Sequence, residues 1–344
     1  LPQGKIWRRY ISQQPQRPEA TVWDGRLSRF SCENAAALNA AYSHVIDMDD
    51  VHNSSITHLG VVTIPTALAV GQKHHSSGRE ILAAIAAGYE AGARIGEAIN
   101  PGAYHYWHTT GVVGSFSSAV AAGKLLGLTP EQFLSAMGSA GTQSAGLWQF
   151  IQDGAMSKTL HTANATLCGI RSAELAALGF TAARDILGGE RGFLGAMTAD
   201  HHPEALTRGL GSQPYQIQTN SFKPYACCRH THSADYCVEL LKKKYALDPA
   251  RIVRITDYTY QVAKDNVDAR HTLRFQIQRP VLHRRRLPLR QPDRRGVLRR
   301  QDQRPRRPRP DGQGHRGGGP RPGGPVSSRP QPVAAPAGSG AGRR

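Results

Sequence analysis

Apolar residues recur every three to four positions through most of the first 215 residues, which is the spacing of helices. Residues 34–46 form an alanine-rich segment of this kind. Pro65 suits the first turn of a second helix. Ser77 and Thr129 each stand three residues before a Glu or Gln, which is the spacing of a capping box, so we expect helices to begin there. No strand pattern occurs before about residue 215, and the abundant Ala and Gly favour closely packed helices.

The pattern changes after this point. The sequence VELLKKKY predicts a helix, Asp248-Pro249 a turn, and residues 252–258 a strand with alternating apolar positions. The predicted fold is therefore mainly α, with a large all-helical domain over residues 1–218. A smaller, truncated α+β lid domain over residues 219–278 follows it.

Residues 279–344 form a separate tail that Arg, Pro and Gly dominate, without any periodic pattern. They contain 18 Arg, no Lys, three Asp and no Glu, so their net charge is +15 of the chain's +18. The preceding 278 residues carry only +3. A basic surface for nucleic acid is therefore a property of the tail alone, and one reading is a disordered tail that binds RNA or anionic surfaces non-specifically.

A frameshift near residue 279 is the reading we favour for this tail, because Arg, Pro and Gly without Lys are what GC-rich DNA encodes in a wrong frame. Residues 289–304 (LRQPDRRGVLRRQDQR) can be back-translated so that a shift of one base reads YGNPTVEAYFGDKIND. That reading is typical of a folded, helix-capable protein. Sequencing the gene tests this hypothesis.

The cysteines and the hydropathy of the sequence indicate the cellular compartment in which the protein is expected. Five cysteines form no spaced framework, and adjacent Cys227 and Cys228 lack the spacing of a zinc site. We therefore expect reduced thiols in a cytoplasmic protein. The sequence shows no signal peptide and no apolar run long enough to span a membrane, so no membrane partner is expected. Because the chain begins with Leu1 rather than Met, we expect a fragment that lacks its natural start.

Acid and imidazole groups are concentrated in the segment HVIDMDDVHNSSITH, residues 44–58, which holds three Asp, three His and no Lys or Arg. A helix end that runs into a polar loop would explain it. A metal site would need four side chains to converge on one ion, although no motif such as HExxH accompanies them: Asp47, Asp49, His52 and His58. Proton transfer on a substrate is the third reading.

Three further polar clusters stand out. His105 and His108 precede a glycine-rich helix start, where backbone N–H groups can hold a carboxylate. Lys158 and His161 lie three apart, which is one face of a helix. The segment FKPYACCRHTHSAD groups further cations and imidazoles: Lys223, Arg229, His230 and His232. Together the clusters supply what elimination on a polycarboxylate requires, namely cations for the carboxylates, a base for a proton alpha to one of them, and an acid.

At these residues the chain resembles the MmgE/PrpD family, which contains 2-methylcitrate dehydratase, cis-aconitate decarboxylase and iminodisuccinate epimerase. The matching stretches are HVIDMDDVHNSSITH, HTTGVVGSFSSAVAAGKLLGLTPEQ, GTQSAGLWQF, MSKTLHTANA, GFTAARDILGGERGFL and FKPYACCRHTHSA. They span nearly all of residues 30–278. The resemblance implies a helical domain with an α+β lid, a homodimer, and neither a metal nor another cofactor.

The resemblance also implies roles for individual residues. Asp47 and His58 match the acid and the histidine of the family's first active-site motif. His108 matches the histidine before the glycine-rich helix, and Lys158 matches the lysine of the central motif. These four are the expected catalytic residues, with His108 or Asp47 as the base. Four residues are expected to bind substrate: Lys223, which matches the lysine of the lid motif, Arg229, His161 and His232.

The expected activity is that of a lyase acting on a small di- or tricarboxylate, most plausibly the dehydration of 2-methylcitrate. Decarboxylation of cis-aconitate and epimerisation of iminodisuccinate are alternatives, because all three reactions can share a carbanion alpha to a carboxylate. A non-enzymatic scaffold with a nucleic-acid-binding tail is the competing class.

The chain departs from the family at several points. Val51 stands where many members have Thr, and the family's Tyr after the stretch matching RFQIQ is replaced by the sequence from Arg279 onward. The family also normally extends some fifty residues upstream. We therefore expect this chain to be catalytically impaired or inactive.

Overall fold

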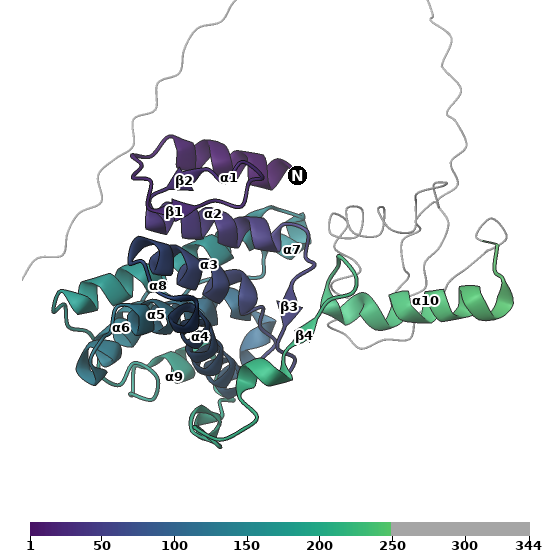
Figure 1. The fold of residues 1–344 in the computed structure, drawn as a ribbon. Coiled ribbons are helices and arrows are strands. Elements are labelled where there is room, and N and C mark those ends of the chain that lie inside the picture. Colours follow the sequence, from purple (N-terminus) through teal and green to yellow (C-terminus); the bar gives the residue numbers. More distant parts are fainter. Residues whose placement is uncertain (249–344) are drawn as a thin grey trace, which may run out of the picture. The chain divides into compact units, whose positions relative to one another are not determined.

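Helices predominate in residues 1–248, the part of the chain that the computed structural model describes (Figure 1). The α-helices are α1 (Pro2–Ser12), α2 (Cys32–His44), α3 (Gly60–Lys73), α4 (Gly78–Ile99), α5 (Thr109–Leu125), α6 (Pro130–Gly141), α7 (Phe150–Asp153), α8 (Ser157–Ala177), α9 (Phe193–Met197) and α10 (His232–Tyr245). Short 3-10 turns are η1 (Gly102–His105), η2 (Pro203–Leu206), η3 (Gln216–Thr219) and η4 (Arg229–Thr231). The predicted strand at 252–258, the second half of the predicted lid (residues 249–278) and the tail from Arg279 lie outside the described residues.

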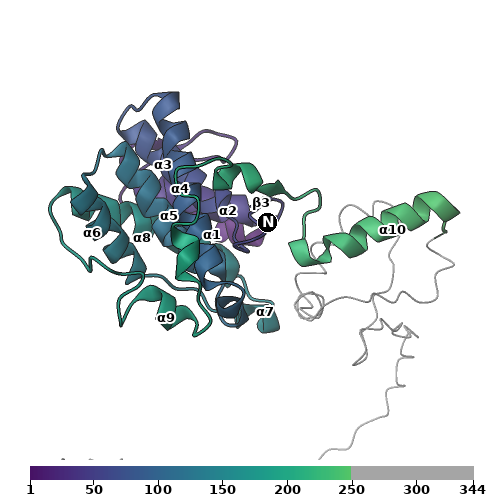
Figure 2. The same cartoon turned by 90° about the horizontal axis from the view of Figure 1, so that it is seen from below.

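Helix α5 lies at the centre of the bundle and packs against α3, α4, α6 and α8 (Figure 2). Its sequence TTGVVGSFSSAVAAGKL is almost entirely buried, and most of its residues are small. Small side chains let helix backbones approach closely, so one helix can be surrounded by four others. The predicted mainly helical fold with closely packed helices is confirmed.

The predicted caps at Ser77 and Thr129 are confirmed. The Ser77 hydroxyl accepts from the N–H of Glu80, and the Thr129 hydroxyl accepts from the N–H of Gln132. Each partner side chain in turn accepts a hydrogen bond from the N–H of the capping residue, as the capping box requires. Among residues 1–248, no helix is both long enough and apolar enough to cross a lipid bilayer.

Helix α3 begins five residues before the position predicted from Pro65. The carboxylate of Asp50 accepts from the N–H of Gly60 through both oxygens, each at 3.1 Å. A carboxylate at this position satisfies a free N–H and opposes the positive end of the helix. Only glycine fits here, because a Cβ on Gly60 would lie 2.5 Å from an Asp50 oxygen. This long-range cap starts the helix early and leaves Pro65 inside it.

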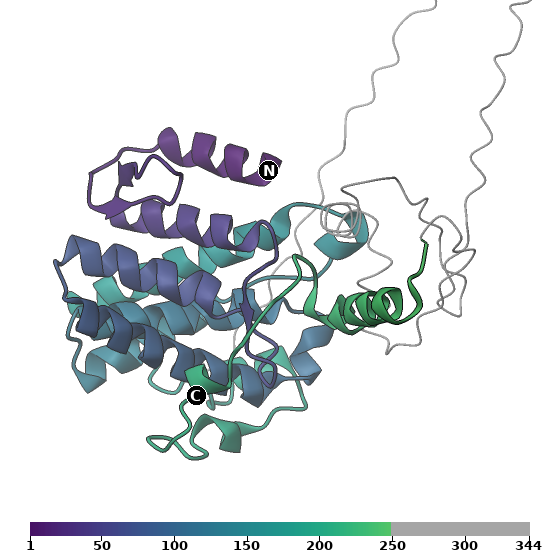
Figure 3. The same ribbon diagram turned by 45° about the vertical axis from the view of Figure 1, so that its right-hand side comes forward.

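The prediction that no strand precedes residue 215 is wrong, although the strands are only two residues long. β1 (Ala20–Thr21) pairs antiparallel with β2 (Arg29–Phe30), and β3 (Asp50–Val51) pairs antiparallel with β4 (Ser221–Phe222). Two residues cannot show an alternating pattern, which explains the miss. The β3–β4 pair sets Asp50 opposite Phe222. The green segment that leads to α10 thereby runs beside the loop that follows α2 (Figure 3).

The contact between α5 and α8 generates a stability prediction. A Cβ on Gly169 of α8 would lie 2.6 Å from the backbone N of Ala119 and 2.8 Å from the carbonyl oxygen of Ser115. The Gly169→Ala variant should therefore lose about 1–3 kcal/mol of unfolding free energy, because backbone atoms cannot yield as a flexible side chain can. Urea unfolding followed by circular dichroism measures this loss.

Gly78→Ala is the matched control. Gly78 is also helical, at the first position of α4, but a Cβ there meets nothing within 4 Å. This variant should stay within about 1 kcal/mol of the native chain, on the stabilising side, because alanine restricts the unfolded chain. Equal urea midpoints for the two variants would contradict the packing argument.

Candidate active site

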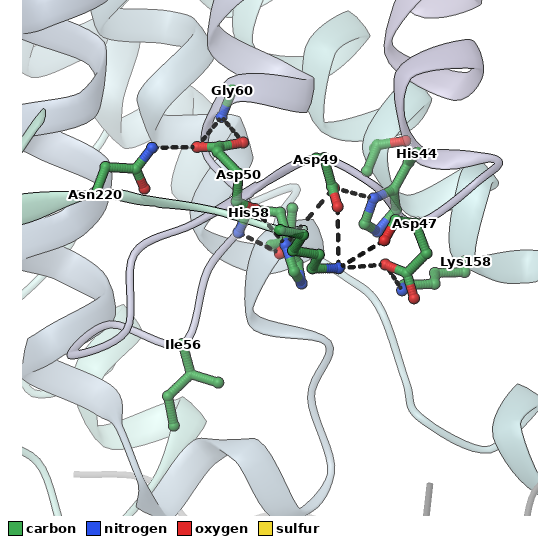
Figure 4. Close-up of polar contacts among 12 residues, drawn as sticks. His44, Asp47, Asp49, Asp50, Ile56, His58, Gly60, Lys158 and Asn220 are labelled. Atoms are coloured by element: carbon green, nitrogen blue, oxygen red, sulfur yellow. Dashed lines mark hydrogen bonds and ion pairs between the residues drawn. The ribbon is translucent and has the colours of Figure 1, made fainter. Parts of the chain in front are cut away.

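The acidic segment predicted from the sequence forms the loop between α2 and α3 (Figure 4). His44 is the last residue of α2, and the loop then carries Asp47, Asp49 and His58. Two residues of the loop other than glycine adopt the left-handed region, Asp47 with φ 54° and Ile56 with φ 50°. Left-handed backbone is unfavourable for a β-branched residue such as Ile56, so surrounding contacts must hold it. Strain of this kind is frequent at functional sites.

Two lysines from distant parts of the chain bind the acidic loop. Nζ of Lys158, in the first turn of α8, lies 2.8 Å from Oδ1 of Asp47. Nζ of Lys223, which directly follows β4, lies 2.6 Å from the same oxygen and 3.0 Å from Oδ1 of Asp49. Lys223 also donates to the carbonyl oxygen of Asp47. The side chain of Lys223 is fully buried, whereas that of Lys158 is 24% exposed.

These ion pairs keep the loop charged. Burial alone would raise the pKa of Asp47, but the ammonium groups of Lys158 and Lys223 hold that pKa well below its usual range. Burial likewise opposes ionisation of Asp49, and His58, His44 and Lys223 nevertheless lower its pKa. Burial lowers the pKa of Lys223, and the carboxylates of Asp47 and Asp49 more than reverse this effect. The carboxylates of Asp47 and Asp49 and the ammonium group of Lys223 are therefore ionised near neutral pH.

His58 presents one ring nitrogen as a proton acceptor. Its Nδ1 donates to the carbonyl oxygen of Asp50 at 2.7 Å, because a carbonyl can only accept. Burial, and then the charge of Lys223, lower the pKa of His58 to about 3. The ring is therefore neutral, its hydrogen lies on Nδ1, and Nε2 holds a lone pair. The side chain of His58 is 15% exposed.

Behind His58 lies a row of buried imidazoles. The ring of His44 lies 5.1 Å from that of His58 and stacks on that of His108 at 5.6 Å with 9° between the planes. His108 in turn contacts His161, with 3.0 Å between their Nδ1 atoms. Burial lowers the pKa of His44 and that of His108. The charge of Lys158 lowers both values further, and neighbouring imidazoles also lower that of His108. Both rings are therefore neutral.

The stretch GTQSAGLWQF, quoted above for the resemblance, encloses His108. The carbonyl oxygen of Gly146 accepts from the His108 N–H at 2.8 Å, and Trp148 lies 4.7 Å from the His108 ring, between centroids. Gly146 has φ 145°, and a Cβ there would lie 3.2 Å from Nδ1 of His161. A Cβ on Gly111 of α5 would lie 3.0 Å from the Cβ of His161. Two glycines thus make room for His161 against His108.

Two residues of the acidic segment have structural roles. Asp50 caps α3 and also accepts from the hydroxyl of Tyr89 at 2.7 Å and from the amide of Asn220 at 2.9 Å. His52 contacts Ser55 and Thr219 instead of the carboxylates. Sequence composition alone could not separate these two from the aspartates and histidine that converge.

The four-residue metal set considered above is wrong in its membership, because His52 does not join it. Among residues 1–248, the acidic and imidazole groups placed as a metal would require are His44, Asp47 and Asp49, with ligand atoms within 4.8 Å of one another. Lys223 lies between the two carboxylates at 2.6 and 3.0 Å. A divalent cation there would face that ammonium group, so this set does not fit a metal.

The structure brings together six of the eight residues predicted for the site: Asp47, His58, His108, Lys158, His161 and Lys223. Arg229 is exposed, and His232 is buried, with its Nε2 3.3 Å from the carbonyl oxygen of Cys227. The roles of all eight stay predictions.

Sequence reasoning missed His44 and gave Asp49 only a metal role. His44 opens the segment and stands five residues before Asp49, but its position at the end of a helix does not reveal that it is buried. One signal in the sequence could have identified His44 and Asp49 as a pair. A histidine at the predicted end of a helix is followed, within the next loop, by aspartates and further histidines. A buried carboxylate needs donors, and an imidazole is the nearest one available.

Residues 1–206 match the MmgE/PrpD N-terminal domain. The chain belongs to the MmgE/PrpD family. Within it, the chain is 33% identical over 231 residues to cis-aconitate decarboxylase of Aspergillus terreus (strain NIH 2624 / FGSC A1156), covering 61% of this chain and 46% of the relative. It is 30% identical over 239 residues to cis-aconitate decarboxylase-like protein oryM of Aspergillus oryzae (strain ATCC 42149 / RIB 40), covering 64% and 49%.

Human cis-aconitate decarboxylase is similar at 28% identity over 251 residues, which cover 71% of this chain and 51% of the human protein. The chain thus spans about half the length of the MmgE/PrpD relatives it matches. The membership that the sequence motifs indicated is confirmed.

The buried imidazoles generate a prediction for pH dependence. Unfolded histidines titrate near about 6.5, whereas His58 titrates near 3 and His44 and His108 below their usual range. Between these values the unfolded chain binds protons that the native chain does not, so stability is lost as pH falls. Each group contributes at most roughly 1.4 kcal/mol per pH unit below its unfolded pKa. Melting temperatures should fall steadily from about pH 7 to about pH 5.

His58→Gln is the variant that checks this origin. It removes one titrating ring and should therefore make the loss of melting temperature between these pH values shallower. Asp47 and Asp49 do not enter this window, because their depressed pKa values place their contribution below about pH 4. A melting temperature that does not change between the two pH values would refute the prediction.

Proposed function

We propose that the site binds a small polycarboxylate and acts on it as a lyase. Membership of the MmgE/PrpD family supports a lyase, and the site's residue types support the substrate class. The observation that carries the proposal is the accessible edge of the cluster, where the partly exposed ammonium group of Lys158 and the lone pair of His58 Nε2 belong to one network. A cation fixes a carboxylate, and an imidazole moves a proton beside it.

The more specific proposal is decarboxylation of cis-aconitate. The names of the similar relatives from Aspergillus and human favour this reaction over the dehydration of 2-methylcitrate expected from the motifs. In this reaction the bond between a CH₂ group and its carboxylate breaks and CO₂ leaves. The electron pair forms a new double bond to the central carbon, and the former double bond takes up a proton at its other end. The products are itaconate and CO₂, with one proton consumed.

His58 is the proposed source of that proton. In the ligand-free site its ring is neutral and holds no hydrogen on Nε2. A bound trianion adds negative charge beside the ring, and negative charge favours the imidazolium form. His58 can therefore take up a proton when the substrate binds and deliver it from Nε2. Lys158 would hold one carboxylate, since its side chain is 24% exposed while its ammonium group donates to Asp47.

Lys223 has a different proposed role from the one expected. It is fully buried, donates hydrogen bonds to Asp47, and forms an ion pair with Asp49. Its ammonium group lies within 3.3 Å of the three oxygen atoms that these contacts involve, and the side chain has no exposed surface. We therefore propose that Lys223 fixes the two carboxylates, while Lys158 meets the substrate.

Turnover is tested with the 344-residue chain and with a version whose reading frame is restored from residue 279. Each is incubated with cis-aconitate, 2-methylcitrate and iminodisuccinate, and products are followed by NMR. We expect itaconate from cis-aconitate with the restored version, at a rate that EDTA leaves unchanged, and little or no turnover with the 344-residue chain. Turnover of 2-methylcitrate alone would replace the specific proposal, and turnover of none of the three by the restored version would overturn both proposals.

Substrate binding is tested by calorimetry with the variant Lys158→Met. The variant should bind cis-aconitate at least about tenfold more weakly than the native chain, because a hydrogen bond to a charged group contributes about 1.5–3 kcal/mol. Lys223 still neutralises Asp47, so the fold is retained. Lys73→Met is the control, because Lys73 pairs with Glu174, at 2.7 Å, and belongs to a separate ion pair between α3 and α8. Equal weakening by both variants would argue against a site at Lys158.

A further inference from the structure

The carboxylate of Asp49 lies between two imidazoles that compete for the same oxygen. Its Oδ2 is 2.6 Å from Nδ1 of His44 and 3.6 Å from Nδ1 of His58. The shorter distance is that of a strong charge-assisted hydrogen bond, and the longer one exceeds hydrogen-bond length. His58 Nδ1 donates instead to the carbonyl oxygen of Asp50. Of the two possible carboxylate–imidazole pairs, Asp49 therefore forms the one with His44 and not the one with His58.

The surroundings of His44 fix this selection. Asp49 is ionised and can only accept, so Nδ1 of His44 carries the hydrogen. The His44 side chain is fully buried, and its ring stacks on that of His108. Its Nε2 is buried without a hydrogen-bond partner among residues 1–248. A ring held in this way keeps its donor pointing at Asp49.

We propose that His44 is a positioning residue that holds Asp49 away from His58. The inference rests on the proposed function, in which His58 takes up its proton only when a substrate binds. If Asp49 turned to His58, the pair would stabilise an imidazolium before substrate arrived. The proton would then be present without the substrate's charge, and the affinity of the site for a trianion would no longer be coupled to proton uptake.

The protonation of His58 depends on charged and titratable groups from five segments of the chain. They are Asp47 and Asp49 on its own loop, Lys223 after β4, Lys158 on α8, and the imidazoles of His44 on α2 and His108 before α5. Lys223 and Lys158 oppose a charged His58, and the carboxylates favour it. Because Asp49 Oδ2 is 3.6 Å away, a small movement would bring it into contact with His58. Removing the donor of His44 should therefore raise the pKa of His58.

Two substitutions of His44 separate the donor from the ring. Asn places an amide N–H near the position of Nδ1 but lacks the ring, whereas Phe keeps a ring against His108 but lacks the donor. In the full chain labelled with ¹⁵N-histidine, NMR titration should show the His58 midpoint rise by about one unit or more in His44→Phe, because an opposite charge at hydrogen-bond distance has this effect. The midpoint should stay near its native value in His44→Asn.

The double variant His44→Phe/Asp49→Asn completes the cycle, since it removes the carboxylate that is proposed to move. In it the His58 midpoint should return to the native value or below. A folded His44→Phe variant with an unchanged midpoint would overturn the proposal. So would an equal rise in His44→Phe and His44→Asn, since this would assign the effect to the ring.

A measurement on the unsubstituted chain covers the case in which a variant fails to fold. The ¹⁵N shifts of His44 should report hydrogen on Nδ1 and none on Nε2, and the reverse pattern would refute the inference. None of these readouts needs turnover. Failure to convert cis-aconitate would therefore count against the proposed function and leave the His44 result to stand or fall alone.

Discussion

The buried ammonium group of Lys223 is the interaction on which the candidate site depends. It lies between the carboxylates of Asp47 and Asp49 and has no exposure to solvent. Loss of one partner from a buried ion pair typically costs about 3–5 kcal/mol, because an uncompensated charge remains. Here two carboxylates share one fully buried cation, so the geometry of the whole loop depends on it. The β3–β4 pair and the Lys223 N–H donating to the Asp49 carbonyl oxygen bring the lysine to this position.

Charge balance explains how so many charged groups can be buried together in the cluster. Two ammonium groups offset two carboxylates, and the imidazoles of His44, His58 and His108 are neutral. A polycarboxylate adds negative charge to a neutral cluster, which a proton on an imidazole can offset. Lys223 and His44 hold the buried side of the cluster in place. Lys158 and His58 are partly exposed, so their positions can change more easily.

The helices and their caps could be predicted from the sequence because they depend on neighbours a few residues apart, as at Ser77 and Thr129. The early start of α3 could not, because its cap comes from Asp50, ten residues upstream across a loop. The residue types of the site were also predictable, with Asp47, Lys158 and Lys223 among them. The specific contacts of each residue were not predictable. The burial of Lys223 and the hydrogen bond between His44 and Asp49 arise only when distant segments pack together.

The separation of Lys223 from Asp47 has a consequence for synthesis on the ribosome. The two residues are 176 positions apart, and a chain that grows at about 5–20 residues per second needs roughly ten to thirty-five seconds to cover that distance. Helices α2 to α8 can begin to pack during this interval, because all of them precede the lysine. Until Lys223 emerges, Asp47 and Asp49 lack the buried cation that they share. The acidic loop therefore stays hydrated while the bundle forms, and it closes as a late step of biogenesis.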